Sequence, residues 1–212
     1  MNTTAYSSAS ERNQQPILDQ LHTLFPQQGT VLEIGSGTGQ HTVFFASNMP
    51  GLLWQPSDRS ENLAGLGARF SDADNERILP LLQLDVIRDP WPGYSYEGVY
   101  SANTAHIMSW DAVVAMFTGV AAHLVPDARF CLYGPFNINN CFTSESNAQF
   151  DAGLRAKDPQ MGIRDMAAIE SLANLHQMQL EHKLAMPANN FILVFKKQAG
   201  SVGRKVVFPD HV

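Results

Sequence analysis

The stretch that decides the fold is Val31-Leu32-Glu33-Ile34-Gly35-Ser36-Gly37-Thr38-Gly39-Gln40. An apolar run ends in an acid and leads into three glycines at alternate positions. A strand that stops in such a loop and restarts as a helix brings bare backbone against a ligand, because glycine has no Cβ and tolerates positive φ. The free N–H groups and positive dipole end of the helix point to the same place. The stretch predicts a site for a nucleotide-like ligand.

The residues around the glycines distinguish between such ligands. The dinucleotide fingerprint G-x-G-x-x-G/A places a small residue where this chain has Gln40, and the third glycine comes one residue early, at Gly39. A phosphate loop needs a lysine after its glycines, and none follows here. Glu33 would repel a pyrophosphate and suits a ligand with positive charge. The pattern resembles motif I of class I S-adenosylmethionine (SAM)-dependent methyltransferases, whose ligand carries a sulfonium and an ammonium group.

The composition narrows the class of protein. The 212 residues are 44% hydrophobic, which fits one domain over 1–212 with a core at about 10–197 and a loosely attached tail at 198–212. A net charge of −6 argues against direct binding of nucleic acid. Two cysteines are too few for a disulfide framework, and no run of apolar residues is long enough to span a membrane. We expect a cytoplasmic protein without a membrane segment.

Strand-like and helix-like segments alternate along the chain. We expect helices at 10–24, 40–47, 62–70, 110–124, 147–156 and 166–178, with Ser10 capping the first, and strands at 31–34, 52–55, 78–84, 96–101, 128–133, 179–185 and 191–195. The last two strands are joined by too few residues for a helical crossover and should form a hairpin. The predicted fold is α/β: a doubly wound, mostly parallel seven-stranded sheet with helices on both faces and an antiparallel C-terminal hairpin. This Rossmann-like arrangement is that of class I methyltransferases.

The predicted cofactor site lies beyond the carboxyl ends of the strands, where ligands of open α/β sheets bind. Asp58 follows the second strand and can accept two ribose hydroxyls, or else it caps the next helix. The resemblance to class I methyltransferases implies that Asp85 accepts from the adenine amino group, that the Val86 amide reaches the ring, and that Asn103 touches the methionine. The predicted cofactor residues are Glu33, Gly35, Ser36, Gly37, Gly39, Gln40, His41, Asp58, Asp85, Val86, Ser101 and Asn103.

Two residues are candidates for catalysis, His106 and Tyr133. His106 follows the fourth strand, and an imidazole with an unperturbed pKa of ~6.5 suits a general base. The alternative is that His106 fixes a loop by hydrogen bonding. Trp91 is either a lid near the adenine or a buried ring under a surface turn. The seven histidines are scattered without metal-ligand spacing, so we expect no metal site.

Later segments narrow the resemblance. They are Trp54-Gln55-Pro56-Ser57-Asp58, Asn103-Thr104-Ala105-His106-Ile107, Tyr133-Gly134-Pro135-Phe136, Ser144-Glu145-Ser146-Asn147, Phe150-Asp151, Leu154-Arg155, Gly162-Ile163-Arg164-Asp165 and Met186-Pro187-Ala188-Asn189-Asn190. Together with the glycine loop they resemble the methyltransferase-like protein twenty-six family, formerly a domain of unknown function, over about 10–197. The resemblance implies a fold that binds SAM as cofactor and S-adenosylhomocysteine as product. It does not imply a substrate.

The acceptor side is expected after the fifth strand, in a helical flap over 142–164. The predicted substrate residues are Phe136, Asn147, Phe150, Asp151, Arg155 and Arg164. Arg155 and Arg164 have two possible roles: they grip an acidic substrate, or they pair with Asp151 and Asp165 and stiffen the flap.

The leading hypothesis is a SAM-dependent methyltransferase, a monomer or homodimer, that methylates a small molecule by in-line displacement. Two alternatives remain. The first is a SAM-binding partner or regulatory protein without chemistry of its own. The second is a nicotinamide oxidoreductase, which Glu33 and Gln40 both disfavour.

Overall fold

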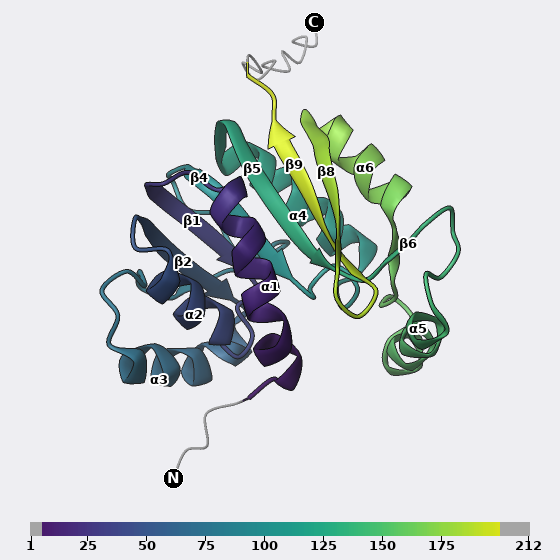
Figure 1. Ribbon diagram of the computed structural model, residues 1–212, viewed down its shortest axis with the longest axis horizontal. Coiled ribbons are helices and arrows are strands. Elements are labelled where there is room, and N and C mark those ends of the chain that lie inside the picture. Colours follow the sequence, from purple (N-terminus) through teal and green to yellow (C-terminus); the bar gives the residue numbers. More distant parts are fainter. Residues whose placement is uncertain (1–5, 200–212) are drawn as a thin grey trace, which may run out of the picture.

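A computed structural model describes residues 6–199 of the chain (Figure 1). Its main sheet has seven strands in the order β3-β2-β1-β4-β5-β9-β8. The first five strands in this row run parallel, and β9 is antiparallel to both of its neighbours. This confirms the predicted fold, including the hairpin. The strands are β1 (Gly29–Ile34), β2 (Leu52–Asp58), β3 (Leu82–Gln83), β4 (Tyr96–Ala102), β5 (Leu124–Gly134), β8 (Met178–Met186) and β9 (Asn190–Lys197).

Helices cover both faces of the sheet because neighbouring strand residues point to opposite sides. In β4, Tyr100 joins one core cluster with residues of α1 and α2, whereas Val99 joins another with residues of α4 and α6. Figure 1 shows α1 crossing in front of the sheet and α4 behind it. The helices are α1 (Ser8–Leu24), α2 (Gln40–Asn48), the short η1 (Ser60–Asn62), α3 (Leu63–Ala73), α4 (Trp110–His123), α5 (Glu145–Lys157) and α6 (Met166–Leu175).

Three predicted boundaries are wrong for local reasons. The cap of α1 is Ser7, whose hydroxyl accepts a hydrogen bond from the Ser10 amide at 3.2 Å. The third strand shrinks to two residues and one bridge at Ile78, because Pro80 has no amide to donate. Helix α6 ends at Leu175, since Gln177 takes a positive φ of 58° before β8 begins. Of the predicted tail, 200–212 lies outside the described residues.

The flap leaves the sheet after β5. Its ends are held together by a second, two-stranded sheet, in which β6 (Phe136–Asn137) pairs in parallel with β7 (Arg164–Asp165). Helix α5 lies between these strands in sequence, and Figure 1 shows it apart from the main sheet, near the turn between β8 and β9. Within the described part of the chain, no helix is both long and apolar enough to cross a membrane.

Candidate functional site

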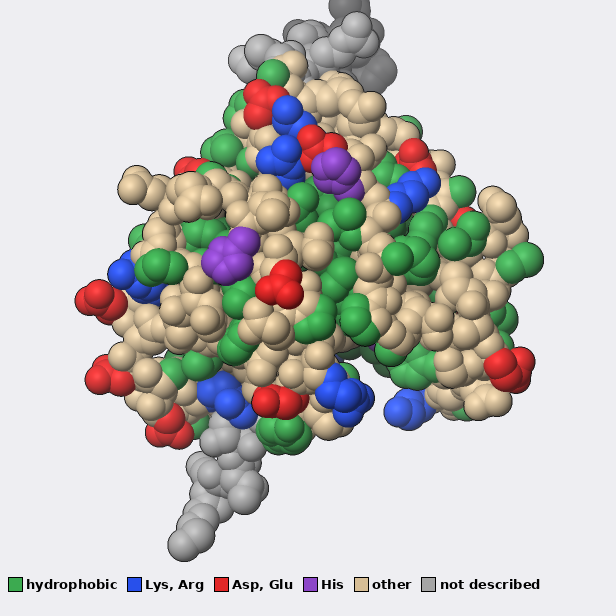
Figure 2. All heavy atoms as spheres, viewed as in Figure 1, with side chains coloured by type: hydrophobic (Ala, Val, Ile, Leu, Met, Phe, Trp, Pro, Cys, Tyr) green, Lys and Arg blue, Asp and Glu red, His purple; other side chains and the backbone are tan. Residues whose placement is uncertain are grey.

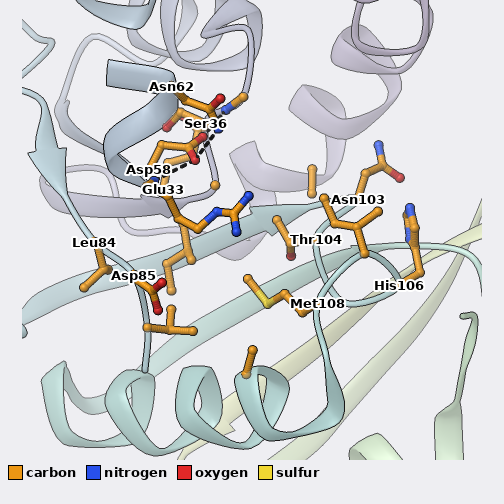
Figure 3. A pocket seen from close by; sticks show the side chains of 18 of the residues that line it. Glu33, Ser36, Asp58, Asn62, Leu84, Asp85, Asn103, Thr104, His106 and Met108 are labelled. Carbon is orange, nitrogen blue, oxygen red and sulfur yellow. Dashed lines mark hydrogen bonds between the residues drawn. The ribbon is translucent and has the colours of Figure 1, made fainter. Parts of the chain in front are cut away.

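A cavity of about 890 Å³ opens at the carboxyl ends of β1, β2 and β4. Small-molecule sites typically measure ~300–1,000 Å³. Its wall consists of the glycine loop, the end of β2, residues that follow β2 and β3, and residues of the loop 102–109. The start of α1 and the flap residues Phe150, Asp158, Gln160 and Met161 also contribute. Figure 3 shows Asp85 and His106 at opposite ends, with the glycine-loop residues nearer Asp85.

The glycine loop has the conformation that its sequence predicts. Gly35, Gly37 and Gly39 have φ values of 73°, 57° and 73°, a region that glycine enters without steric cost. A Cβ at Gly35 would lie 2.6 Å from the Thr104 methyl group, so this position also needs glycine for space. Gly39 caps α2 with its backbone, and its added Cβ would strike α3. Gly35 and Gly37 line the cavity, but Gly39 does not.

Asp58 fastens the glycine loop to the end of β2. One carboxylate oxygen accepts from the Gly37 amide at 2.7 Å. The other accepts from the Arg59 amide and from the Asn62 side chain, each at 2.8 Å. A carboxylate offers about four lone-pair sites, so about one remains for a ligand. The predicted contact with ligand hydroxyls is compatible with this geometry. The alternative, that Asp58 caps the next helix, is wrong, because the cap residues of η1 and α3 are Arg59 and Asn62.

Glu33 is a buried carboxyl group in the cavity wall, with 2% of its surface exposed. Its Oε2 accepts from the Thr42 hydroxyl at 2.5 Å. Burial raises the pKa of Glu33 to about 8, the negative charge of Asp58 raises it further, and the hydrogen bonds from Thr42 and Ser36 oppose the shift. A cation beside Glu33 would stabilise its carboxylate and lower this pKa. The charge of the site therefore fits a positively charged ligand.

Asp85 lies on a short segment fixed by its own backbone. The Leu84 amide donates to the Asp58 carbonyl at 2.8 Å, and the Asp85 amide donates to Asp89 at 2.7 Å. The Asp85 carboxylate accepts from the Ile87 amide at 3.0 Å and faces the cavity (Figure 3). Val86 lies next to Asp85 in the cavity wall. Together the two residues offer a hydrogen-bond acceptor and an apolar surface to a flat ring.

Three further predicted cofactor residues support the wall. Gln40 does not line the cavity: its side chain accepts from the Ser7 amide at 2.6 Å and donates to the Ser7 carbonyl at 3.3 Å. Ser101 does not line it either, because its hydroxyl donates to the Ile34 carbonyl at 2.7 Å. His41 does line it, but Tyr100 and Asn13 engage its two ring nitrogens, at 3.2 and 2.7 Å. These three residues position the glycine loop.

The two catalytic candidates lie in different places. His106 lines the cavity with 5% of its surface exposed, and Phe150 packs edge-on against it at 5.2 Å. Burial lowers the pKa of His106 to about 4, and the nearby Arg164 cation contributes. The ring is therefore neutral at pH 7 and can accept a proton only weakly. Tyr133 is buried in the core cluster that includes residues of α1 and α2, and it does not line the cavity.

Most of the predicted substrate residues hold the flap together. Arg155 pairs with Asp151 at 2.7 Å, and Asp151 also accepts from the Ile163 amide at 2.7 Å. Arg164 does not pair with Asp165, which caps α6; it donates to the Ala105 and Gln160 carbonyls at 3.0 and 2.8 Å and to that of Met108. The role in stiffening the flap is thus the one that the contacts support.

The remaining three substrate candidates divide between flap, core and cavity. Asn147 donates to the Thr143 hydroxyl at 2.9 Å and to the Asn189 carbonyl at 3.3 Å, which ties α5 to the β8–β9 turn. Phe136 is buried in the core. Of the six predicted substrate residues, Phe150 alone is among the described residues that line the cavity.

Several lining residues carry no recognisable signal in the sequence. The start of α1 and the flap segment 158–161 reach the cavity only through tertiary packing. Thr104 and Met108 stand in the loop after β4, where their position alone could have suggested them. Trp91 is not a lid: it stacks on His123 at 5.2 Å and covers Gly119 of α4, where an added Cβ would fall on its ring.

A protein-family model described as "Protein of unknown function (DUF938)" matches residues 4–197. The chain belongs to the DUF938 family. The match covers nearly the whole chain and includes both the glycine loop and the flap. The family description assigns no activity, so it supports the relationship alone.

This DUF938 chain has the fold of solved methyltransferase structures. The SAM-dependent methyltransferase SibL in its apo form is 19% identical with a TM-score of 0.76, over 90% of this chain and 56% of that one. An O-methyltransferase family protein from Burkholderia thailandensis is 14% identical (TM-score 0.78; 91% and 58%). Human N-acetylserotonin methyltransferase in complex with SAM is 15% identical (TM-score 0.75; 90% and 53%). The chain spans a little over half the length of these proteins. At such identities the likeness shows the class I methyltransferase fold.

Proposed function

We propose that this protein is a SAM-dependent methyltransferase with a small-molecule acceptor. The observation that carries the proposal is the row of three carboxyl groups, Glu33, Asp58 and Asp85, at the carboxyl ends of three neighbouring strands in one cavity. In this assignment Asp58 accepts from the ribose hydroxyls, and Asp85 and Val86 hold the adenine. Glu33 and the glycine loop hold the charged methionine part, with Asn103 next to it. The solved structures that share the fold belong to methyltransferases, which supports the same assignment.

The bound cofactor would supply a methyl group on sulfur that already has a good leaving group. The protein's contribution is then mainly placement, which can lower a barrier by ~7–11 kcal/mol. His106 stands at the acceptor end as a neutral ring and can take a proton from an acceptor there. General-base catalysis is typically worth ~10²–10⁴-fold, and a base with so low a pKa belongs at the lower end.

The cellular setting is part of the proposal. The likeness in the later motifs leads us to place the chain in the methyltransferase-like protein twenty-six family, as a single domain that acts as a monomer or homodimer. Free Cys131 and Cys141 support a reducing compartment such as the cytoplasm. On the face drawn in Figure 2 basic and acidic side chains are intermixed, which supports the absence of a direct nucleic-acid partner.

Calorimetric titration with S-adenosylhomocysteine tests the cofactor assignment. We expect micromolar binding to the wild type and a loss of at least about tenfold in Asp85→Ala, which removes one charged acceptor but leaves the Asp58–Gly37 bond in place. Asp127→Ala is the matched control, because Asp127 pairs with Lys196 outside the cavity. No binding to the wild type, or tight binding of NADH instead, would refute the proposal.

A screen with labelled SAM tests the chemistry. We expect methyl transfer to a small molecule that falls about 100-fold in His106→Ala, with binding of S-adenosylhomocysteine retained. Binding of the cofactor without turnover on any acceptor would instead favour the alternative of a SAM-binding regulatory protein.

A further inference from the structure

The end of the cavity near His106 carries exposed apolar surface. Ile107 is 49% and Phe150 is 44% exposed although both line a concave site, and Met108 and Met161 lie in the same wall. These side chains come from the loop after β4 and from the flap. Exposed apolar groups around a concavity are typical of a ligand-binding surface. The ligand that covers them must itself present apolar area.

The two flap arginines, Arg155 and Arg164, lie outside the cavity wall, and their donors have partners in the protein. Arg155 holds Asp151, and three backbone carbonyls take up the guanidinium of Arg164. Neither arginine lines the cavity. The two lining arginines, Arg59 and Arg88, follow β2 and β3, on the side where Asp85 lies, and Arg59 pairs with Glu61 at 2.7 Å.

A carboxylate lies at the acceptor end instead. Asp158 lines the cavity directly after α5, and one of its oxygens accepts from the Gln160 amide at 2.8 Å. Among the residues of the loop after β4 and of the flap that the structure describes in this wall, the other titratable group is His106, which is neutral at pH 7. The Arg164 cation lies near enough to lower the pKa of His106, but it does not line the cavity. An anion placed here would therefore meet Asp158 without a cation in the wall to bind it directly, and burying an unpaired charge is costly.

We propose that the methyl acceptor is a small molecule with an apolar ring and no anionic group, and that its ring packs against Phe150 with the accepting atom near His106. This inference rests on the proposed function and specifies its substrate class. Phe150 already meets His106 edge-on, and aromatic rings favour such edge-to-face and offset contacts. A neutral acceptor is tolerated beside Asp158, and a cationic one is attracted.

Three compounds with one ring and different charge test the proposal. Tyramine is a cation at pH 7, 4-ethylphenol is neutral and 4-hydroxyphenylacetate is an anion. Each is titrated into protein saturated with S-adenosylhomocysteine. We expect the cation and the neutral compound to bind. The anion should bind with an affinity at least about tenfold lower. Equal or tighter binding of the anion, or no saturable binding of any of the three, would overturn the inference.

Two flap phenylalanines provide a matched pair of variants. Phe150→Ala should lower the affinity for 4-ethylphenol about three- to tenfold. Phe142→Ala should not, because Phe142 is equally exposed, at 43%, but does not line the cavity. Asp158→Asn should narrow the gap between the anion and the neutral compound, because Asn keeps an oxygen for the Gln160 amide and removes the charge. Equal effects of the two phenylalanine variants, or an unchanged gap, would refute the assignment.

Retained binding of S-adenosylhomocysteine shows that each variant is folded. It also separates the two proposals. If the homocysteine compound does not bind to the wild type, the proposed function fails. If it binds and the ring compounds do not behave as expected, the substrate class alone fails.

Discussion

The two ends of the cavity use their charged side chains in opposite ways. At the end near Asp85, the carboxyl groups of Glu33, Asp58 and Asp85 face the space that a ligand would fill. At the end near His106, Asp158 is the one charged flap residue, among those that the structure describes, that lines the cavity, whereas Asp151 and Arg155 lie outside the wall and brace the flap. Polar residues at the ends of parallel strands are therefore good candidates for ligand binding. Polar residues of a long inserted segment such as the flap serve first to hold that segment in its conformation.

The contrast has a structural origin. The strands at the first end are tied into one sheet by their ladders, so the side chains at their ends are not needed to hold the strands together. The flap has the short pairing of β6 with β7 and a bridge between Ile138 and Cys141, and it satisfies other buried backbone groups with side chains, as Asp151 does for the Ile163 amide. The following substitutions test this division, from the largest expected effect to the smallest.

Glu33→Gln should raise the stability of the protein at neutral and alkaline pH and lower the affinity of the site for its ligand. A carboxyl group whose pKa rises on folding from 4.5 to about 8 favours the folded state at low pH, and this contribution is lost as the pH rises from 4.5 to 8. Above pH 8 the free energy of unfolding of the variant should therefore exceed that of the wild type by on the order of 5 kcal/mol. This difference should vanish near pH 4.5. Denaturation of both proteins from pH 5 to 9 isolates Glu33, because both retain His41 and His106.

The same variant should bind S-adenosylhomocysteine more weakly, since the amide offers no charge to an ammonium group. A stability difference that does not vary with pH would contradict the raised pKa, and unchanged affinity would contradict the role of Glu33 in binding.

Asp58→Ala should reduce the affinity for S-adenosylhomocysteine about 100-fold, equivalent to ~2.7 kcal/mol. It removes a ligand acceptor and also the bond that holds the Gly37 amide. Asp58→Asn keeps one oxygen for the Arg59 and Asn62 donors and should lose less. Calorimetry on both variants gives the ranking, and equal losses would mean that Asp58 acts by charge alone.

Gly162→Ala should destabilise the protein by ~2 kcal/mol without changing its affinity for the cofactor. Gly162 has a φ of 147°, and an added Cβ would strike the Arg155 guanidinium and lie 2.9 Å from Asp151. Gly153→Ala in α5 is the control, because its Cβ meets open space and should stabilise the helix by ~0.5–1 kcal/mol. Urea denaturation distinguishes the effects of the two substitutions on stability. Weaker cofactor binding in Gly162→Ala would show that the two ends of the cavity are coupled.

Asn147→Ala should cost ~1 kcal/mol, the usual net worth of a lost hydrogen bond. Its effect should be local: faster amide hydrogen exchange in α5 and in the turn that Asn189 belongs to, and an unchanged rate in the glycine loop. Unaltered exchange in the turn would show that the bond to the Asn189 carbonyl does not hold it.

The sequence predicts the fold and the conformation of the glycine loop because local patterns determine them. Alternation and a short connector are enough for the sheet and its hairpin, and the glycine loop follows from residue type. Tyr133 shows where such reasoning fails: it stands near the carboxyl end of β5, but its side chain packs into the core cluster with α1 and α2, a tertiary contact that the apolar strand sequence does not reveal. Two of the three carbonyls that accept from Arg164 belong to residues 56 and 59 positions away, beyond any local pattern.

The bridge between Gln40 and Ser7 has a consequence for how binding would be felt elsewhere. It joins the first turn of α1 to the glycine loop across 33 residues of sequence, and both segments touch the cavity. Binding of any ligand that contacts both segments is thermodynamically linked to the docking of α1. Docking of α1 raises the affinity for the ligand by the same factor by which the ligand favours docking. A substitution at Gln40 would thus weaken a ligand that it never touches, and the order of a helix at the start of the chain would report on occupancy of the cavity.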